Sequence, residues 1–555
     1  MRHPNAIVTT LACALLSAAC TSTDSTASFH GPARMYDGFD GYARAIKTDS
    51  AACQRWFDQG LQLLYGYNHD EAIRSFQQAA KEDPEAPMPW WGVSYAAGLH
   101  INNPAMGSEK TTLAVAAARE ARQRIGAATP VEAALVRAVS ERYVDPNPED
   151  RKHLDQAYAD AMEVAWKQHP NDPDVGALYA ESLMCLQPWD LWTNDGQPKG
   201  RALEIVDVLE RVMAMDEDHP GANHFYIHTV EASPNPDRAV PAADRLRSLV
   251  PGSGHLVHMP SHVYIRVGRY GDAADANERA IAADERYFET APAPDFYSLY
   301  FLHNVHFLAY ATMMEGRPSV ALAAARKIES DIPPEFLRAY VELADAFMTT
   351  PLHVMIRFGR WEEILAEPEA PDWRLLSRAV RHYARGVAFA ATGRTEEARA
   401  ELANFDRVAT TIPDDWAVLN NPVDNVLPIA RAMLVGELAY REGRLDDAFE
   451  SLRQAVELED ELVYDEPPGW MQPTRHALGA LLLEAGRPDE AAVVFHADLA
   501  KHPDNGWALL GLEQAERQLG NAAVADDHRA RRAAVWQRAE IEPEAACYCA
   551  TGERG

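Results

Sequence analysis

The sequence predicts an all-helical protein, a right-handed α-solenoid of antiparallel helix pairs. A glycine followed by Arg or Asn recurs along the chain, and an acidic, alanine-rich segment follows each such step. Apolar residues stand at helical spacing in stretches such as 432–457 and 475–499, and no sustained strand-like alternation occurs. The 555 residues, 47% of them hydrophobic, suffice for a large core, and a repeat array accounts for this length without several separate domains.

The glycine steps mark the repeats. They stand 48, 43, 34, 50, 43 and 34 residues apart, and tetratricopeptide repeats have a period of about 34 residues. Each glycine is expected to close the first helix of a pair in a left-handed conformation. An earlier unit has Gly66 at the step, and Asn68 with Glu71 three residues later resembles a capping box. The longer spacings predict insertions or lengthened helices. The seven glycines are Gly268, Gly316, Gly359, Gly393, Gly443, Gly486 and Gly520.

Residues 1–20 predict an export signal, because basic residues precede an apolar stretch that is too short to span a membrane. Residues 16–20, Leu-Ser-Ala-Ala-Cys, resemble a bacterial lipobox. That resemblance implies cleavage before Cys20, a lipid on its thiol and, because Thr21 follows in place of Asp, anchoring to the outer membrane on its periplasmic side. The alternative is a plain secretory signal cut nearby.

Three further regions follow the signal. Residues 21–50 begin with many Ser and Thr residues and predict a flexible tether. Residues 51–535 predict the solenoid. Residues 536–555 are short of apolar periodicity and predict a dispensable tail.

Charge and motifs exclude several functions. The formal net charge is -31, and no basic run is present, which argues against a nucleic-acid partner. No glycine-rich phosphate loop and no serine-hydrolase elbow occurs.

Histidines provide the strongest functional indication. Seven of the 20 histidines fall in the 83 residues from 224 to 306, where composition alone would place about three. They occupy the first helices of three consecutive predicted pairs, and those helices line the concave wall of a tetratricopeptide solenoid. A bound metal ion would explain such a cluster. The seven are His224, His228, His255, His258, His262, His303 and His306.

The spacing within these rows brings side chains to one helix face. His224 and His228 with Glu231 stand at i, i+4 and i+7, and the second row repeats this pattern at i, i+3 and i+7. Two histidine pairs on adjacent helices offer four nitrogens, so the predicted core of the site is His224, His228, His258 and His262. His255 is a further metal ligand, and Glu231, His303 and His306 are ligands or groups that orient the rings.

Pro260 complicates the second row, because a proline starts or kinks a helix. A metal-free polar pocket and plain structural hydrogen bonding remain alternatives to the metal site. Asn304, Trp189 and Asp190 are candidate groove residues, and His100 stands where it could reach the same groove.

Several stretches resemble a family of bacterial exported tetratricopeptide-repeat proteins. The resemblance covers most of residues 50–520 and implies the fold, whereas it implies no particular chemistry. The stretches are residues 188–192, 219–228, 231–233, 254–262, 303–308 and 464–468.

Two functions follow from these observations. The first is a lipid-anchored solenoid of the cell envelope whose histidine-lined concave groove binds a peptide, protein or small ligand, together with zinc, copper or iron. The alternative is a metal-dependent enzyme, a hydrolase or oxidoreductase, that uses the same histidines with Glu231 or Asp190 as general base.

Overall fold

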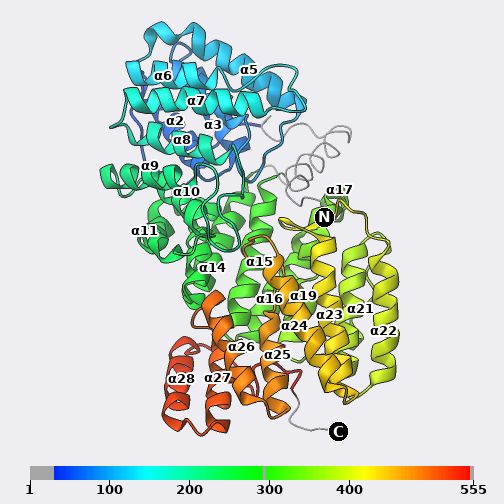
Figure 1. Ribbon diagram of the computed structural model, residues 1–555. Coiled ribbons are helices and arrows are strands. Elements are labelled where there is room, and N and C mark those ends of the chain that lie inside the picture. The colour runs from blue at the N-terminus through cyan, green and yellow to red at the C-terminus, as the bar shows by residue number, and fades with distance from the viewer. Residues whose placement is uncertain (1–30, 292–295, 551–555) are drawn as a thin grey trace. The chain divides into compact units, whose positions relative to one another are not determined.

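The computed structural model describes residues 31–291 and 296–550. These residues form paired helices with one short hairpin, so the all-helical fold of packed helix pairs predicted from the sequence is confirmed. Consecutive helices such as α2 (Ala51–Tyr65) and α3 (His69–Glu82), or α23 (Val423–Arg441) and α24 (Leu445–Glu461), pack against each other. Figure 1 shows the pairs α21–α22 and α23–α24 side by side.

The chain divides into two compact units. The first holds residues up to Val263 together with Glu278–Phe301, and the second holds Tyr264–Asn277 together with the residues from Leu302 onward. Further helices of the first unit are α4 Pro87–Ala96, α5 Ser108–Gln123, η2 Ile125–Ala127, α6 Pro130–Val139, α7 Lys152–Gln168, α8 Pro173–Met184, α9 Ala202–Met215, α10 Pro220–Val230, η3 Pro236–Ala239, α11 Val240–Leu249 and α12 Gly254–His258.

Three helices have residues in both units: α13 Pro260–Arg266, α14 Tyr270–Phe288 and α15 Ser298–Met314. The second unit continues with α16 Pro318–Asp331, α17 Pro334–Ala339, α18 Val341–Phe347, α19 Thr350–Arg357, α20 Trp361–Ala366, α21 Leu375–Ala391, α22 Thr395–Ala409, α25 Thr474–Glu484, α26 Pro488–Lys501, α27 Gly506–Gln518 and α28 Ala522–Val535. Its hairpin pairs β1 Ala417–Val418 with β2 Asn421–Pro422 in antiparallel fashion.

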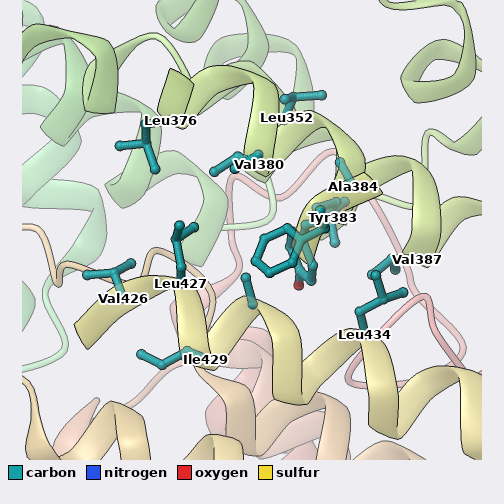
Figure 2. Packing of buried hydrophobic residues seen from close by; sticks show 14 of the residues in the cluster. Leu352, Leu376, Val380, Tyr383, Ala384, Val387, Val426, Leu427, Ile429 and Leu434 are labelled. Atoms are coloured by element: carbon teal, nitrogen blue, oxygen red, sulfur yellow. The ribbon is translucent and has the colours of Figure 1, made fainter. Parts of the chain in front are cut away.

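The core of the second unit lies between α21 and α23. Figure 2 shows Val380, Tyr383 and Val387 on one side and Leu427 and Leu434 on the other, directed toward the same interior. All of them are buried, and burying a Val or Leu side chain contributes about 1.5–3 kcal/mol. Apolar packing between neighbouring helices therefore stabilises this part of the array.

Left-handed glycines close the first helices, as the sequence predicts. All seven step glycines have φ between 62° and 82°. The backbone N–H after each one donates to the carbonyl five residues earlier, as Arg444 does to Ala439 at 2.9 Å. This pattern is the Schellman motif, which satisfies carbonyls at the end of the helix.

The first helix pair departs from this rule. Tyr67, with φ of 55°, takes the left-handed position there, and Gly66 has φ of -92°. The equivalent bond runs from the Asn68 N–H to the Leu63 carbonyl at 2.9 Å. The sequence pattern placed the step one residue too early, at Gly66.

The segment 31–50 packs on the first unit, which corrects its prediction as the end of a flexible tether. The Tyr36 N–H donates to Gln59 Oε1 at 2.8 Å, and the Arg44 guanidinium forms an ion pair of 2.6 Å with Asp174. Side chains of the helices thus satisfy an extended segment that has no apolar periodicity of its own. The predicted signal at 1–20 and the rest of the tether, residues 21–30, lie outside the described residues.

The described part of the tail, residues 536–550, is also packed, and the prediction that it is dispensable stays a prediction. Trp536 is buried and its Nε1–H donates to the Met314 carbonyl at 2.9 Å. Arg538 pairs with Glu315 at 2.9 Å. Ala546 and Cys549 add apolar packing, so polar contacts and isolated buried side chains hold this segment without helical periodicity. Within the described residues, no helix combines the length and the apolar character needed to cross a membrane.

A glycine-to-alanine change tests the left-handed cap. An added Cβ at Gly443 would meet nothing within 4 Å, so its effect comes from the backbone alone, where φ is 75°. We expect Gly443→Ala to lower the free energy of unfolding by about 1–2 kcal/mol and Gly443→Asn to lower it less, because Asn tolerates this conformation. Urea denaturation of the three proteins measures the difference, and an alanine variant as stable as wild type would contradict the assignment.

Candidate metal centre

Three helices position the five histidines, all of which belong to the first unit. His224 and His228 lie on α10, His255 and His258 on α12, and His262 on α13. The imidazole of His219 caps the start of α10 by accepting the Ala222 N–H at 3.1 Å, and Pro220 occupies the first helical position. A proline at the first position of α13 likewise separates it from α12. The structure therefore starts a new helix at Pro260, one of the two outcomes that the sequence predicted.

All five imidazoles are buried, each with at most 6% of its surface exposed. The sequence predicted that they line a concave groove, and in the structure the rings themselves are buried. The end of α2 packs closely on α10, because Gly221 has no side chain and the Tyr65 ring lies only 2.5 Å from the place that a Cβ would occupy. The ring of Tyr67, in the turn after α2, lies against His224 with centroids 4.7 Å apart. Trp189, which is partly exposed, lies edge-on against His228 with ring centroids 5.2 Å apart.

His224, His228 and His255 form one group of potential ligands. Each offers a ring nitrogen, and these nitrogens lie within 4.8 Å of one another. His224 Nδ1 lies 2.7 Å from the Tyr65 carbonyl, so this nitrogen carries the proton and Nε2 carries the lone pair. His224 Nε2 and His255 Nε2 are 3.1 Å apart. Two nitrogens bound to one ion at about 2.0–2.1 Å are separated by roughly 3.0–3.4 Å, so this spacing fits a shared ion.

His228 presents the same nitrogen to the group. Its Nδ1 lies 3.0 Å from Glu231 Oε1 and donates to it, which leaves the lone pair on Nε2. That Nε2 is buried and has no hydrogen-bond partner in the described part of the chain. A buried acceptor of this kind requires an explanation, and coordination of an ion provides one.

Glu231, which follows α10, holds two imidazoles at once. Its second oxygen accepts from His262 Nδ1 at 2.6 Å. Burial opposes ionisation of the carboxyl, but His262 and His228 outweigh that effect and hold the pKa of Glu231 well below its ordinary value. An ionised carboxylate that accepts from histidine ligands fixes their tautomer and orientation in many metal sites. The structure places Glu231 where it can act as this orienting group.

The three histidines of the group are electrostatically suited to bind a cation. Burial is the largest cause of a lowered pKa at each of His224, His228 and His255. The rings are therefore neutral at neutral pH, and neutral imidazole is the form that binds metal ions.

His258 and His262 form a second close pair, with their Nε2 atoms 2.8 Å apart. The sequence grouped these two with His224 and His228 as the core of one site and set His255 beside it. In the structure His255 is the residue that joins His224 and His228, whereas Glu231 links His262 to His228.

The remaining predicted groove residues lie in different surroundings. Asp190 has 57% of its side chain exposed and pairs with Lys199, so it is not placed to serve the buried group as a base. His303, Asn304 and His306 lie on α15 in the second unit. His306 Nε2 is 3.3 Å from Met471 Sδ.

Sequence reasoning missed Tyr67. Its ring centroid lies 4.7 Å from that of His224, 5.5 Å from that of His255 and 4.2 Å from that of His100, on which it stacks. His100 thus reaches the cluster through this tyrosine. The only signal in the sequence was a tyrosine at the position where later repeats have a glycine.

No family model matches the chain, and no curated protein matches it. Among solved structures, the APC/C hetero-tetramer Cut9-Hcn1 is similar at 12% identity and a TM-score of 0.31, covering 89% of this chain and 78% of that chain. The human IFIT1 dimer with m7Gppp-AAAA is similar at 11% identity and a TM-score of 0.34, covering 90% and 96%. Similarities of this size carry no conclusion about chemistry.

Replacing the shared carboxylate tests its role. We expect Glu231→Gln to lower the free energy of unfolding of the metal-free protein by about 1–3 kcal/mol, because an amide has one acceptor oxygen and cannot satisfy both imidazole N–H groups. Glu210→Gln is the control, since Glu210 also has two partners, Tyr226 and Arg238, but is 43% exposed, and its loss is expected to cost less than about 1 kcal/mol. Thermal or urea unfolding measures both variants. Equal losses of unfolding free energy in the two would contradict the role of Glu231 as the shared acceptor.

Proposed function

We propose that the protein binds a transition-metal ion in its first unit through His224, His228 and His255. The proposal rests chiefly on the buried His228 Nε2, which lacks a partner among the described residues and lies in a group of three neutral imidazoles. Glu231 and the Tyr65 carbonyl hold the other nitrogens of His228 and His224, so the lone pairs are available to an ion. Structural hydrogen bonding alone does not explain this arrangement, because it leaves His228 Nε2 unsatisfied.

The ligand set favours zinc, copper or iron, since imidazole suits all three. Structural zinc sites use four protein ligands, whereas catalytic sites use three and keep one position open. The group of three imidazoles in one cluster thus supports a second candidate, a metal-dependent hydrolase or oxidoreductase. In such a site the ion supplies Lewis acidity, and Glu231 orients His228 and His262 in place of acting as a general base.

The burial of the centre limits its ligands. Because each imidazole is at most 6% exposed, a small molecule is a better candidate for this site than an extended peptide. Binding of a peptide or protein by the helical repeats remains a separate proposal that rests on the fold class.

We also propose that the protein is a lipoprotein of the cell envelope, anchored through Cys20. Its support is the sequence of residues 16–20, which resembles a lipobox.

Metal analysis tests the proposed function directly. The full chain, purified without chelators, is expected to carry one transition-metal ion in the cluster, and the double variant His228→Ala, His255→Ala is expected to lose it because one ligand remains. His353→Ala, which removes a buried imidazole of the second unit, is expected to retain the ion. Elemental analysis, with circular dichroism to verify folding, measures this. A metal-free wild type, or a folded double variant with full metal content, would refute the centre.

A Cys20→Ser variant tests the anchor. Without the thiol no lipid is attached, so we expect the variant in the soluble fraction and the wild type in the membrane fraction. Fractionation followed by immunoblotting gives the answer, and a wild-type protein that is wholly soluble would contradict the anchor.

A further inference from the structure

Tyr67 adopts a left-handed backbone conformation, which is adopted by glycine at the seven later steps between paired helices. Its φ of 55° places it in the left-handed region, where all seven later step residues are glycines. A side chain in this region is strained because its Cβ approaches the backbone. Such strain persists where the surroundings require the side chain, and it gathers at functional sites.

The surroundings of Tyr67 are the imidazole cluster. Besides His224, His255 and His100, its ring faces His228, with centroids 6.3 Å apart and an interplanar angle of 17°. The residue is 3% exposed. An aromatic ring at this position fills the space beside the candidate metal ligands, and a phenylalanine would fill it equally well.

Packing explains the ring of Tyr67 but does not explain its hydroxyl. Tyr67 Oη is buried and has no hydrogen-bond partner within residues 31–291 and 296–550. A phenol is protonated at neutral pH, so this hydroxyl is a hydrogen-bond donor. A buried donor without an acceptor is unfavourable, and a bound acceptor would satisfy it.

The charge of the centre indicates the kind of acceptor. The three neutral imidazoles bring no charge to a divalent ion, and Glu231 is a buried carboxylate bonded directly to one of them. Glu181, a second buried carboxylate that acts on Tyr67, also acts on the buried Arg142 guanidinium, whose positive charge offsets it. One negative charge does not neutralise two positive charges in a buried site, so an anion at the open position is favoured.

We propose that the Tyr67 hydroxyl donates a hydrogen bond to an oxygen atom of a small carboxylate ligand at the open position of the ion. This proposal rests on the metal centre proposed above. Tyr67 is then a ligand-binding residue, and the strained turn holds its phenol among the imidazoles.

Acetate binding to the cobalt-loaded full chain tests the proposal, because Co²⁺ absorbs visible light and its spectrum reports changes in its ligands. We expect Tyr67→Phe to bind Co²⁺ with unchanged stoichiometry and to bind acetate about 10 to 100 times more weakly, the effect of losing a hydrogen bond to a charged group. Tyr95→Phe is the matched control, because that hydroxyl donates to Glu181 at 2.6 Å in the same unit. It is expected to leave acetate affinity unchanged.

Thermal unfolding of the metal-free variants gives an independent readout. Tyr67→Phe is expected to raise the melting temperature, because it removes a buried hydroxyl without a partner, whereas Tyr95→Phe is expected to lower it. A lowered melting temperature for Tyr67→Phe would show that the hydroxyl has a structural partner and would overturn the proposal.

The outcomes separate the two proposals. Unchanged acetate affinity in cobalt-loaded Tyr67→Phe overturns the role of Tyr67 and leaves the metal centre standing. A wild-type protein that binds no Co²⁺ overturns both.

Discussion

The candidate centre depends on one buried carboxylate. Glu231 accepts hydrogen bonds from His228 and His262, and so decides which nitrogen of each ring carries the proton. It also joins α10 to α13, two helices that are separated along the chain by α11, α12 and the break at Pro260. The hydrogen bonds that Glu231 accepts therefore set the direction of the Nε2 lone pairs that an ion would use.

The helix pairs repeat a regular backbone pattern, and the candidate site lies next to residues that depart from this pattern. Left-handed glycines end the first helices of the later pairs, while Tyr67 and Trp189 hold the same conformation with φ of 55° and 60°. Both of these aromatic residues lie against His228. Four non-glycine residues of the described chain have positive φ, and two of them lie around this one imidazole, while Leu419 and Asp504 belong to the second unit. Departures from local rules of sequence and structure are expected at functional sites.

Much of the fold could be predicted because it repeats. Gly443 and its equivalents indicate helix ends, because they adopt a left-handed conformation that other residues avoid. Histidines at helical spacing indicate a common helix face. Helical periodicity did not settle the grouping within the site. It paired His258 and His262 with α10, and in the structure His255 joins His224 and His228 in one group, while His262 meets His228 in another through Glu231.

Segments held by isolated long-range contacts could not be predicted from the same patterns. Arg44 reaches Asp174 across 130 residues of sequence, and Trp536 reaches the Met314 carbonyl across 222. Neither contact produces a periodic sequence pattern, so residues 31–50 were predicted as part of a flexible tether and residues 536–550 as part of a dispensable tail. Burial of the histidines was missed for a related reason, since the turn at Tyr67 and the segment around Trp189 cover them from outside the histidine-bearing helices.

The division of the chain also constrains how the first unit is assembled during synthesis. That unit includes Glu278–Phe301, which the chain reaches only after contributing Tyr264–Asn277 to the second unit. The late segment supplies Tyr287, which donates to Glu71 at 3.3 Å, and Tyr297, whose oxygen accepts from the His255 backbone N–H at 3.4 Å. A nascent chain that has emerged only as far as residue 263 lacks these contacts, so no single cut of the chain releases a complete first unit. The helix that carries His255 gains its contact with Tyr297 only when about forty further residues have been synthesised.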